Sequence, residues 1–349
     1  MQSSGPSARP RFIAPSPAAI INRFGLLIVI LIGVAVMSQA SPVFFTAINF
    51  TNVFYVGSLI AVVALGQMFV LLVGGIDLSV GAVVAISSVL VVGLSQDSGL
   101  PTWLAVIVSL LVATGFGLLN GVLTTKFKIS SLIVTLGTLS VARGLAFMYT
   151  GGSNLAPIPK ELSVVGNASI GTFPLVIVFA LVIALVAHIV LSSTRFGRSI
   201  YAVGGNPVAA RLSGIRSDRI VILAFMVSGL LAGVGGLMIT VRLGAGSASA
   251  GSGLELAVIA AVVIGGTSLF GGEGRVPGTL LGVLLLGLVQ NSINLLAVPA
   301  NVDMVVSGVV IVLAAGVDVY RRLYLEPALA RRSLEKAQDA AARGDTSSS

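Results

Sequence analysis

Residues 56–81 read VGSLIAVVALGQMFVLLVGGIDLSVG. The run up to Val73 contains no charged side chain, and about 20 apolar residues in a helix cross the hydrocarbon core of a bilayer. Two consecutive glycines, Gly74 and Gly75, then interrupt the apolar pattern ahead of Asp77. We therefore predict a membrane span over residues 56–73, followed by a break in the helix.

The composition of the whole chain extends this prediction. Of 349 residues, 56% are apolar and 9% are charged, and the mean hydropathy is +1.07, whereas about 25% of the residues of a soluble domain are charged. A water-soluble globular protein is excluded. The 20 Lys and Arg exceed the 12 Asp and Glu, and this excess lies in tails and loops. The pattern indicates an integral membrane protein rather than a nucleic-acid binder.

Several kinds of chemistry are missing from the chain. It has no cysteine and a single histidine, His188, which excludes disulfides, thiol catalysis and a metal site made of paired histidines. The phosphate-binding pattern G-x-x-x-x-G-K-[ST] is absent as well. We therefore expect no metal, no cofactor and no enzymatic activity on this chain, and transport becomes the default class of function.

We expect an all-α membrane protein of about ten transmembrane helices, each set by an apolar run between polar or Gly/Pro residues. They lie near residues 24–40, 56–73, 82–95, 103–123, 132–149, 173–191, 220–241, 255–269, 278–297 and 303–320. Alternation from a cytoplasmic N-terminus satisfies the positive-inside rule. It puts these basic groups on the cytoplasmic side: Lys126 and Lys128, Arg195 to Arg219, Arg275, and Arg321 with Arg322. Both termini are predicted to be cytoplasmic.

This organisation gives one membrane domain, residues 24–322, between two tails. Residues 1–23 are basic and rich in proline, and residues 323–349 alternate alanine with charge before a run of serines. We expect the first tail to be disordered and the second to be partly so. Residues 24–40 also fit the apolar core of a secretory signal peptide, although the long Pro-rich segment before them favours a retained span.

Two Gly-Gly breaks resemble each other. VGGIDLSVG at 73–81 and IGGTSLFGG at 264–272 each follow an apolar run, and their alignment pairs Gly74 with Gly265 and Leu78 with Leu269. Paired interruptions in two halves of a chain are typical of discontinuous helices around a transporter's pathway. We expect the pathway between the two breaks.

Ionisable side chains inside spans are costly and face a partner or water. Asp77, Arg143 and Glu255 are such residues, and each has a structural alternative: Asp77 as a helix cap, Arg143 as part of an ion pair, Glu255 as an interfacial residue. Amides suit a polyhydroxylated solute but serve equally as hydrogen bonds between helices. The amides on expected spans are Gln67, Asn120, Gln290, Asn291 and Asn294. The eight residues that we assign to the substrate pathway are Gln67, Asp77, Ser79, Arg143, Glu255, Gln290, Asn291 and Asn294.

The longest predicted cytoplasmic loop is STRFGRSIYAVGGNPVAARLSGIRSDRI at 193–220. Asn206-Pro207 is a helix start signal and Ser213-Gly214 is a stop signal. They predict one short helix over 206–213, surrounded by arginines. A surface anchor for anionic lipid would explain the arginines but not the helix start and stop signals.

Several strings in order carry a family resemblance: GGIDLSVGAVVAISS (74–88), TLGTLSVARGLAFMYTGG (135–152), RFGRSIYAVGGNPVAARLSGI (195–215), GLLAGVGG (229–236) and GGTSLFGGEGRVPGTLLGVLLLGLVQNSINLL (265–296). With them, residues 42–318 resemble the membrane-spanning permease of ribose/xylose-type ABC sugar importers. The resemblance implies an ABC importer permease fold and a bacterial inner-membrane location. It also implies a second permease copy, identical or paralogous, an extracytoplasmic sugar-binding protein, and ATPase subunits that hold ATP and Mg.

The resemblance also implies roles for individual residues. Asp77 and Ser79 match the family's first break, and Glu255 matches its acidic position before GGTSL. The segment from Gly204 to Gly214 resembles the helix that couples the permease to the ATPase. The residues at its centre are Asn206, Pro207, Ala209, Ala210, Arg211 and Ser213.

Other functions stay open at this point. A secondary transporter or channel acting alone would need more intramembrane acidic groups than Asp77 and Glu255. The sister permeases for branched-chain amino acids and nucleosides share the ten-span plan but resemble this chain less at IDLSVGA. The solute is expected to be a monosaccharide or a sugar alcohol, and the sequence does not name it.

Overall fold

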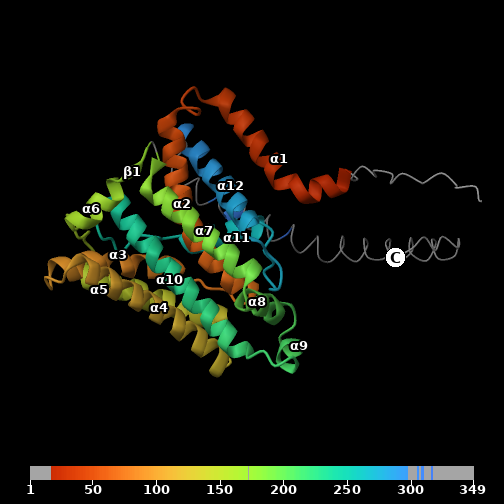
Figure 1. Cartoon of the computed structure of the whole chain (residues 1–349). Coiled ribbons are helices and arrows are strands. Elements are labelled where there is room, and N and C mark those ends of the chain that lie inside the picture. The colour runs from red at the N-terminus through yellow and green to blue at the C-terminus, as the bar shows by residue number, and fades with distance from the viewer. Residues whose placement is uncertain (1–16, 172, 298–304, 306–307, 310–315, 317–349) are drawn as a thin grey trace, which may run out of the picture.

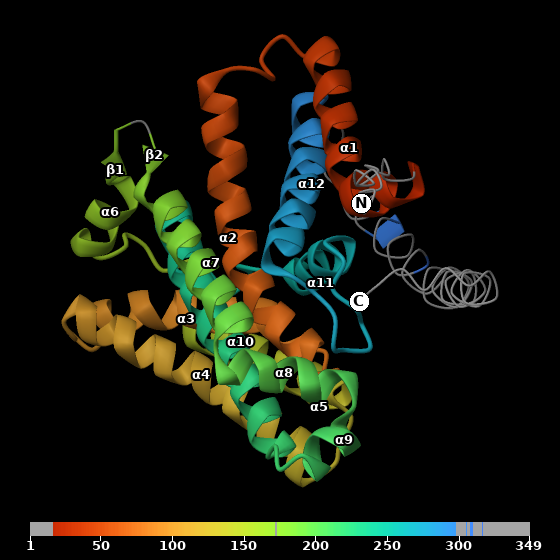
Figure 2. The ribbon, with the colours of Figure 1, turned by 45° about the vertical axis from the view of Figure 1, so that its right-hand side comes forward.

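The structure is a computed structural model that describes residues 17–171, 173–297, 305, 308, 309 and 316. Most of the expected span 303–320 lies outside these described residues. So do Arg321 and Arg322, residues 1–16 and the C-terminal tail 323–349. The described part is a bundle of helices (Figures 1 and 2).

Nine of the helices correspond to expected spans. Six of them are long and apolar enough to cross a membrane: α2 (Ala47–Leu72), α4 (Thr102–Lys126), α5 (Ser131–Thr150), α7 (Leu175–Ser193), α10 (Ser217–Leu243) and α12 (Val276–Leu295). The other three are α1 (Pro17–Ala40), α3 (Val80–Gln96) and α11 (Leu254–Ile264), which have shorter apolar lengths. The prediction of a helical membrane protein is confirmed. Short helix α6 (Lys160–Asn167) and a hairpin of two-residue strands, β1 (Ser169–Ile170) with β2 (Phe173–Pro174), were not expected.

Some expected boundaries were wrong. Helix α2 begins at Ala47 rather than near residue 56, because the Thr46 side chain caps it by accepting from the Asn49 N–H at 3.3 Å. Helix α1 begins at Pro17, ahead of the expected Phe24, and α11 ends at Ile264 instead of near 269. The first turns of α2 contain polar residues, so a search for uninterrupted apolar runs places the start of this helix too late.

The loop at 193–220 holds two short helices, not one. The expected helix is confirmed as α9 (Pro207–Leu212), and α8 (Arg195–Gly205) precedes it. Thr194 caps α8 by accepting from the Gly197 N–H at 3.1 Å, and Ile200 and Val203 are buried along one side. The signal that we missed is the cap followed by apolar residues at helical spacing.

Helices α10 and α2 lie at the centre of the bundle. Helix α10 packs on α2, α3 and α4, whereas α2 also packs on α7, α11 and α12, and α1 packs on α12 (Figure 2). The contact between α4 and α10 is close because small residues face each other. A Cβ added at Gly229 would overlap the carbonyl oxygen of Ala113. Such small-residue contacts are a common means of helix association in membranes.

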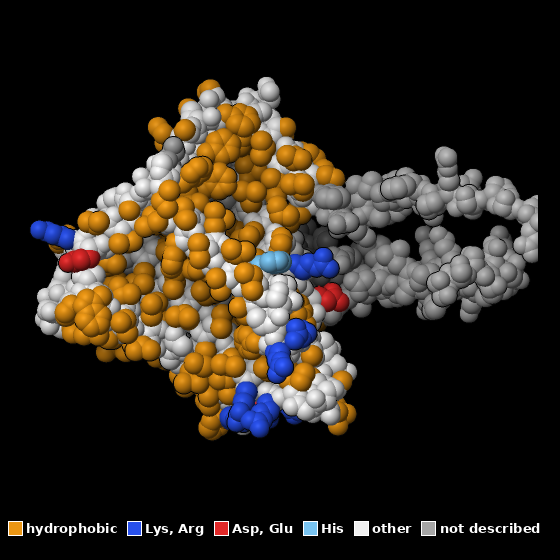
Figure 3. Space-filling model, in the orientation of Figure 1, with side chains coloured by type: hydrophobic (Ala, Val, Ile, Leu, Met, Phe, Trp, Pro, Cys, Tyr) orange, Lys and Arg blue, Asp and Glu red, His pale blue; other side chains and the backbone are white. Residues whose placement is uncertain are grey.

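Apolar side chains cover much of the outside of the bundle (Figure 3). Ile32, Leu111 and Leu181 are 58%, 65% and 60% exposed, respectively. A soluble protein does not expose so much continuous apolar surface. This surface therefore faces lipid, and the chain is a multi-pass membrane protein.

Candidate functional site

The segment between α2 and α3 is the first candidate site. Helix α2 ends at Leu72, Gly74 has a φ of +79°, and α3 begins at Val80. The side-chain amide of Gln67, oriented to satisfy both groups, donates to the Asp77 carbonyl at 2.9 Å and accepts from the Asp77 N–H at 3.2 Å. The Ile76 N–H donates to Ser131 Oγ at 3.1 Å. Side chains of α2 and α5 therefore satisfy the backbone of this segment.

The Asp77 carboxylate lies inside the protein, only 1% exposed. Its Oδ1 accepts from the Ser79 N–H at 3.0 Å and from Ser79 Oγ at 2.6 Å. Its Oδ2 accepts from Ser228 Oγ of α10 at 2.9 Å. Asp77 thus fixes the turn that leads into α3 and links it to α10. This role is structural, but the N-cap residue of α3 is Ser79 rather than Asp77.

Two further residues extend this polar network. Asn120 of α4 donates to Ser79 Oγ at 2.9 Å, and Thr138 of α5 donates to Asn120 Oδ1 at 2.7 Å. All these side chains are buried. We call Gln67, Asp77, Ser79, Asn120, Thr138 and Ser228 the Asp77 network. It joins α2, α4, α5 and α10 to the segment before α3, and a buried hydrogen-bonded network favours one arrangement of its helices.

The segment between α11 and α12 is the second candidate site. Helix α11 ends at Ile264, Gly266 has a φ of +87°, and α12 begins at Val276. The Gly272 N–H of this segment donates to the Leu72 carbonyl, the last residue of α2, at 2.9 Å. The two segments that carry the Gly-Gly pairs therefore touch through their backbones.

Helix α8 joins the same contact. A Cβ on Gly204 would overlap the Leu72 carbonyl oxygen, and one on Gly271 would lie 2.9 Å from the Gly74 nitrogen. We call Leu72, Gly74, Gly204, Gly271 and Gly272 the glycine junction. It brings together α2, α8 and the second break with no side chain between their backbones.

Tyr201 adds a hydrogen bond beside this junction. Its hydroxyl, on α8, donates to the Gly274 carbonyl at 2.9 Å. Burial raises the pKa of Tyr201, and the nearby Arg275 opposes that rise. The hydroxyl therefore stays protonated and able to donate at neutral pH.

Helix α9 has the caps that its sequence predicts. Asn206 Oδ1 accepts from the Val208 and Ala209 N–H groups at 3.1 and 3.0 Å, and Gly214 ends the helix with a φ of +82°. Ala210 is buried, whereas Leu212 is 86% exposed. The helix therefore presents an apolar side chain to its surroundings at the end of the bundle where α4 ends and α10 begins (Figure 1).

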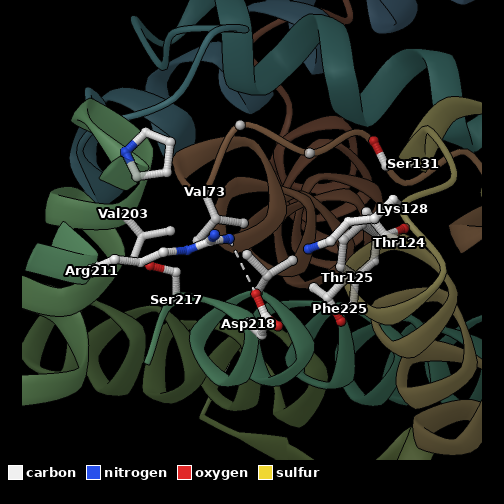
Figure 4. A pocket seen from close by; sticks show the side chains of 14 residues that line it. Val73, Thr124, Thr125, Lys128, Ser131, Val203, Arg211, Ser217, Asp218 and Phe225 are labelled. Carbon is white, nitrogen blue, oxygen red and sulfur yellow. Dashed lines mark hydrogen bonds and ion pairs between the residues drawn. The ribbon is translucent and has the colours of Figure 1, made fainter. Parts of the chain in front are cut away.

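A hollow of about 200 Å³ separates α9 from the first break (Figure 4). Gly74, Gly75, Arg211 and Asp218 are among its lining residues. Lys128 lies opposite Arg211. Arg211 Nη2 pairs with Asp218 Oδ1 at 3.3 Å. Lys126 pairs with the other carboxylate oxygen at 3.2 Å. Arg211 is therefore already in an ion pair within this chain, although its side chain is 59% exposed.

Arg143 and Glu255 form a separate polar group. Arg143 Nη1, on α5, donates to the Ala248 and Ala250 carbonyls at 2.8 and 2.7 Å, in the loop between α10 and α11. Glu255 lies in the first turn of α11 and interacts electrostatically with Arg143. Its Oε2 is buried and has no hydrogen-bond partner among the described residues. Arg143 holds this loop by two charge-assisted hydrogen bonds.

The predicted amides of α12 lie elsewhere again. Asn291 and Asn49 of α2 exchange two hydrogen bonds, of 2.7 and 3.2 Å, that tie α12 to the start of α2. Gln290 is half-buried and Asn294 is exposed. Because Asn49 lies about 35 Å along α2 from Leu72, this group is distant from the first break.

Comparison with known proteins now places the chain. The family model described as "Branched-chain amino acid transport system / permease component" matches residues 49–315. The chain belongs to this permease family. No solved structure matches the permease significantly.

Named relatives cover nearly all of the permease. The ribose import permease protein RbsC of Haemophilus influenzae is 40% identical over 300 residues, 84% of this chain and 92% of the relative. The D-allose transport system permease protein AlsC of Escherichia coli is 35% identical over 298 residues, 85% and 91% of the two chains. The L-arabinose ABC transporter permease protein AraH of Azospirillum brasilense is 36% identical over 327 residues, 90% and 96%.

The eight predicted pathway residues of the permease therefore occupy three places. Gln67, Asp77 and Ser79 meet in the Asp77 network, Arg143 lies beside Glu255, and the three α12 amides lie at the far end of the bundle. Sequence reasoning did not assign Ser228, Thr138 or Asn49 to any site. Hydroxyls on apolar helices often bond to their own preceding turn, so Ser228 and Thr138 carry no distinguishing signal.

Proposed function

We propose that this chain is the permease subunit of an ATP-driven importer for a monosaccharide. The relatives named above are permeases for ribose, D-allose and L-arabinose. The sequence has no P-loop of its own, so ATP and Mg would be held by separate ATPase subunits. A sugar alcohol is the other polyol that such a permease would carry.

The full assembly has several further parts in this proposal. About ten spans with both termini in the cytoplasm cross the bacterial inner membrane. Two permease copies, identical or paralogous, form the translocation unit, and a sugar-binding protein delivers the solute from outside. ATPase subunits dock at α9, the segment from Gly204 to Gly214.

The sugar pathway runs beside the two breaks. Irregular backbone exists at membrane depth only where protein buries it or water reaches it. Asp77 and Ser79 hold the first break in shape, while Arg143 and Glu255 fix the loop before α11. The amides of α12 contribute at the opposite end of the bundle.

The glycine junction carries the proposed coupling between ATP use and the pathway. Helix α9 follows α8 directly, and α8 touches the ends of both breaks through Gly204. No flexible side chain lies between these backbones. A movement of α8 would therefore move the two breaks by nearly the same distance. This contact is the single observation that supports a mechanical link from the cytoplasmic surface to the pathway.

The test is reconstituted uptake. The permease is purified with the ATPase encoded beside its gene and placed in liposomes with the cognate binding protein outside. Labelled ribose, allose, arabinose and leucine are then offered, leucine because the family description names branched-chain amino acids. We expect ATP-dependent uptake of at least one sugar and none of leucine.

Two outcomes would contradict the proposal. Uptake of leucine alone would move the permease to the amino-acid branch of its family. Sugar uptake that follows an imposed proton gradient without ATP would identify a secondary transporter.

A further inference from the structure

Helix α6 (Lys160–Asn167) lies at the end of the bundle away from α9, beside the β hairpin (Figures 1 and 2). It packs on α10 closely enough that a Cβ on Gly166 would overlap the Val241 side chain. Hollows lie on both sides of this contact, and Val241 lines both. Neither hollow contains a residue of the sites described above.

The first hollow is apolar. It has a volume of about 510 Å³ and lies between α4, α6, α7 and α10. Its lining consists of aliphatic side chains, Phe179, Met238 and Gly166. Phe179 and Val182 are 48% and 51% exposed, so the hollow opens on the lipid-facing surface of the bundle. A hollow of this chemistry accommodates hydrocarbon.

The second hollow has cationic and polar side chains among apolar ones. It has a volume of about 570 Å³, and Lys160, Ser163 and Asn167 of α6 line it together with Arg242 of α10. Neither Lys160 nor Arg242 forms an ion pair with any described residue. Arg242 lies over the Tyr55 ring with Cζ 5.5 Å from the ring centre. Glu161, the neighbouring acid, accepts a hydrogen bond from Thr102 of α4 and does not line the hollow.

We propose that these adjoining hollows form one binding site for an anionic phospholipid. An acyl chain occupies the apolar hollow, and the headgroup phosphate lies between Lys160 and Arg242. The two parts have the order that a lipid requires, since the cationic part lies at the helix ends and the apolar part lies along the helices. A free anion would leave the apolar hollow unused, and an apolar peptide would leave both cations unpaired.

The charged half is tested with matched lipids. Purified permease is titrated with phosphatidylglycerol and phosphatidylcholine of identical acyl chains, and native mass spectrometry counts bound lipid. We expect wild type to prefer phosphatidylglycerol. The exposed pair Lys160→Gln and Arg242→Gln should weaken phosphatidylglycerol binding roughly 10- to 30-fold, because each basic residue near a headgroup contributes about a fivefold preference. The pair should leave phosphatidylcholine binding unchanged.

A control variant removes the same charge elsewhere. Arg195→Gln with Arg198→Gln takes two exposed cations from α8. This variant should keep the wild-type preference. Equal loss of phosphatidylglycerol in both double variants would mean that net charge alone attracts the lipid, and would overturn the proposal.

The apolar half has a matched pair on one helix face. Val182→Trp puts an indole into the apolar hollow, whereas Val186→Trp adds the same bulk one turn further along α7, outside it. Val186 is 53% exposed, almost the same as Val182. We expect Val182→Trp to reduce binding of both lipids and Val186→Trp to reduce neither.

Photolabelling distinguishes a lipid from another occupant. A phosphatidylglycerol with a photoreactive acyl chain should label peptides of α6, α7 and α10 in wild type and label them much less in Val182→Trp. Absence of label there in wild type, or equal effects of the two tryptophan variants, would overturn the proposal. Because lipid binding is measured without sugar or ATP, its failure leaves the transport assignment untouched.

Discussion

Gly204 of α8 packs directly on the carbonyl oxygen of Leu72, the last residue of α2, so that a methyl group has no room between them. The same carbonyl accepts the Gly272 N–H at 2.9 Å. One backbone oxygen is therefore shared by helix α8 and the segment after α11.

Gly204→Ala should destabilise the permease by about 1–3 kcal/mol, since overpacking forces backbone atoms apart. Gly205→Ala is its control, because a Cβ at Gly205 meets no atom within 4 Å. Thermal unfolding in detergent, followed by size-exclusion chromatography, compares the two. Equal melting temperatures for both variants would show that the glycine junction tolerates a side chain.

Asp77→Ala should cost more stability than Asp77→Asn. Alanine leaves the Ser79 N–H and the Ser228 hydroxyl unpaired in a buried place, and each such loss costs about 1–3 kcal/mol. Asparagine keeps an acceptor for Ser79, and the Ser228 hydroxyl can rotate to accept from the new amide.

Comparing the melting temperature with the rate of sugar uptake for the two Asp77 variants distinguishes a structural role of Asp77 from a role in transport. Asp77→Asn should impair uptake more than it impairs folding. Full uptake by Asp77→Asn would limit Asp77 to holding the break in shape.

Arg211→Glu should lower co-purification of the ATPase while leaving expression and membrane insertion normal. Its ion pair with Asp218 is largely exposed, and such pairs contribute about 0–1 kcal/mol. Asp218→Asn breaks that ion pair from the other side and keeps the cation on α9. If both variants retain the ATPase equally, Arg211 serves only its own chain or the lipid surface.

Asn49→Ala and Asn291→Ala should each lower stability by about 0.6–2 kcal/mol, the range for hydrogen bonds between membrane helices. The double variant should cost less than the sum of the single variants, because either substitution alone already removes the two hydrogen bonds that the amides share. Thermal unfolding of the four proteins gives this coupling. Additive losses would mean that the two amides do not interact.

Reporter fusions after Leu155 and after Arg198 should lie on opposite sides of the membrane. Leu155 precedes α6, Arg198 lies in α8, and α7 lies between those two helices. Alkaline phosphatase and fluorescent-protein fusions read the two sides. The same side for both positions would mean that α7 does not cross the membrane and would overturn the alternating topology.

Apolar runs predict where the long helices lie, and caps predict α9. These signals are local: Asn206 and Gly214 act within a few residues of the helix that they delimit. The meeting of Gly204 with Leu72 and Gly272 is not local, because it depends on how three separate segments pack. No periodicity in one segment reports that contact.

The candidate pathway residues show the same division. Intramembrane charge singles out Asp77, but its partner Ser228 is 151 residues away and resembles many other helical serines. Similarly, the sequence marks Asn291 as an amide in a span, while its position far from the first break becomes apparent only in the folded bundle. Residue type predicts that a polar group needs a partner, and only packing determines which partner it finds.

The side-chain oxygen of Asn206 already accepts hydrogen bonds from the Val208 and Ala209 N–H groups, so it is not free to bind a partner protein. A protein that seats itself on α9 therefore meets mainly Leu212 and Val208, which are 86% and 67% exposed, with Arg211 beside them. Recognition at this surface then combines the cation of Arg211 with the shape of an apolar contact, and added salt screens only the first of these. A complex formed here should survive purification at high ionic strength, and a cell with several importers would keep their subunits from mixing by differences in fit.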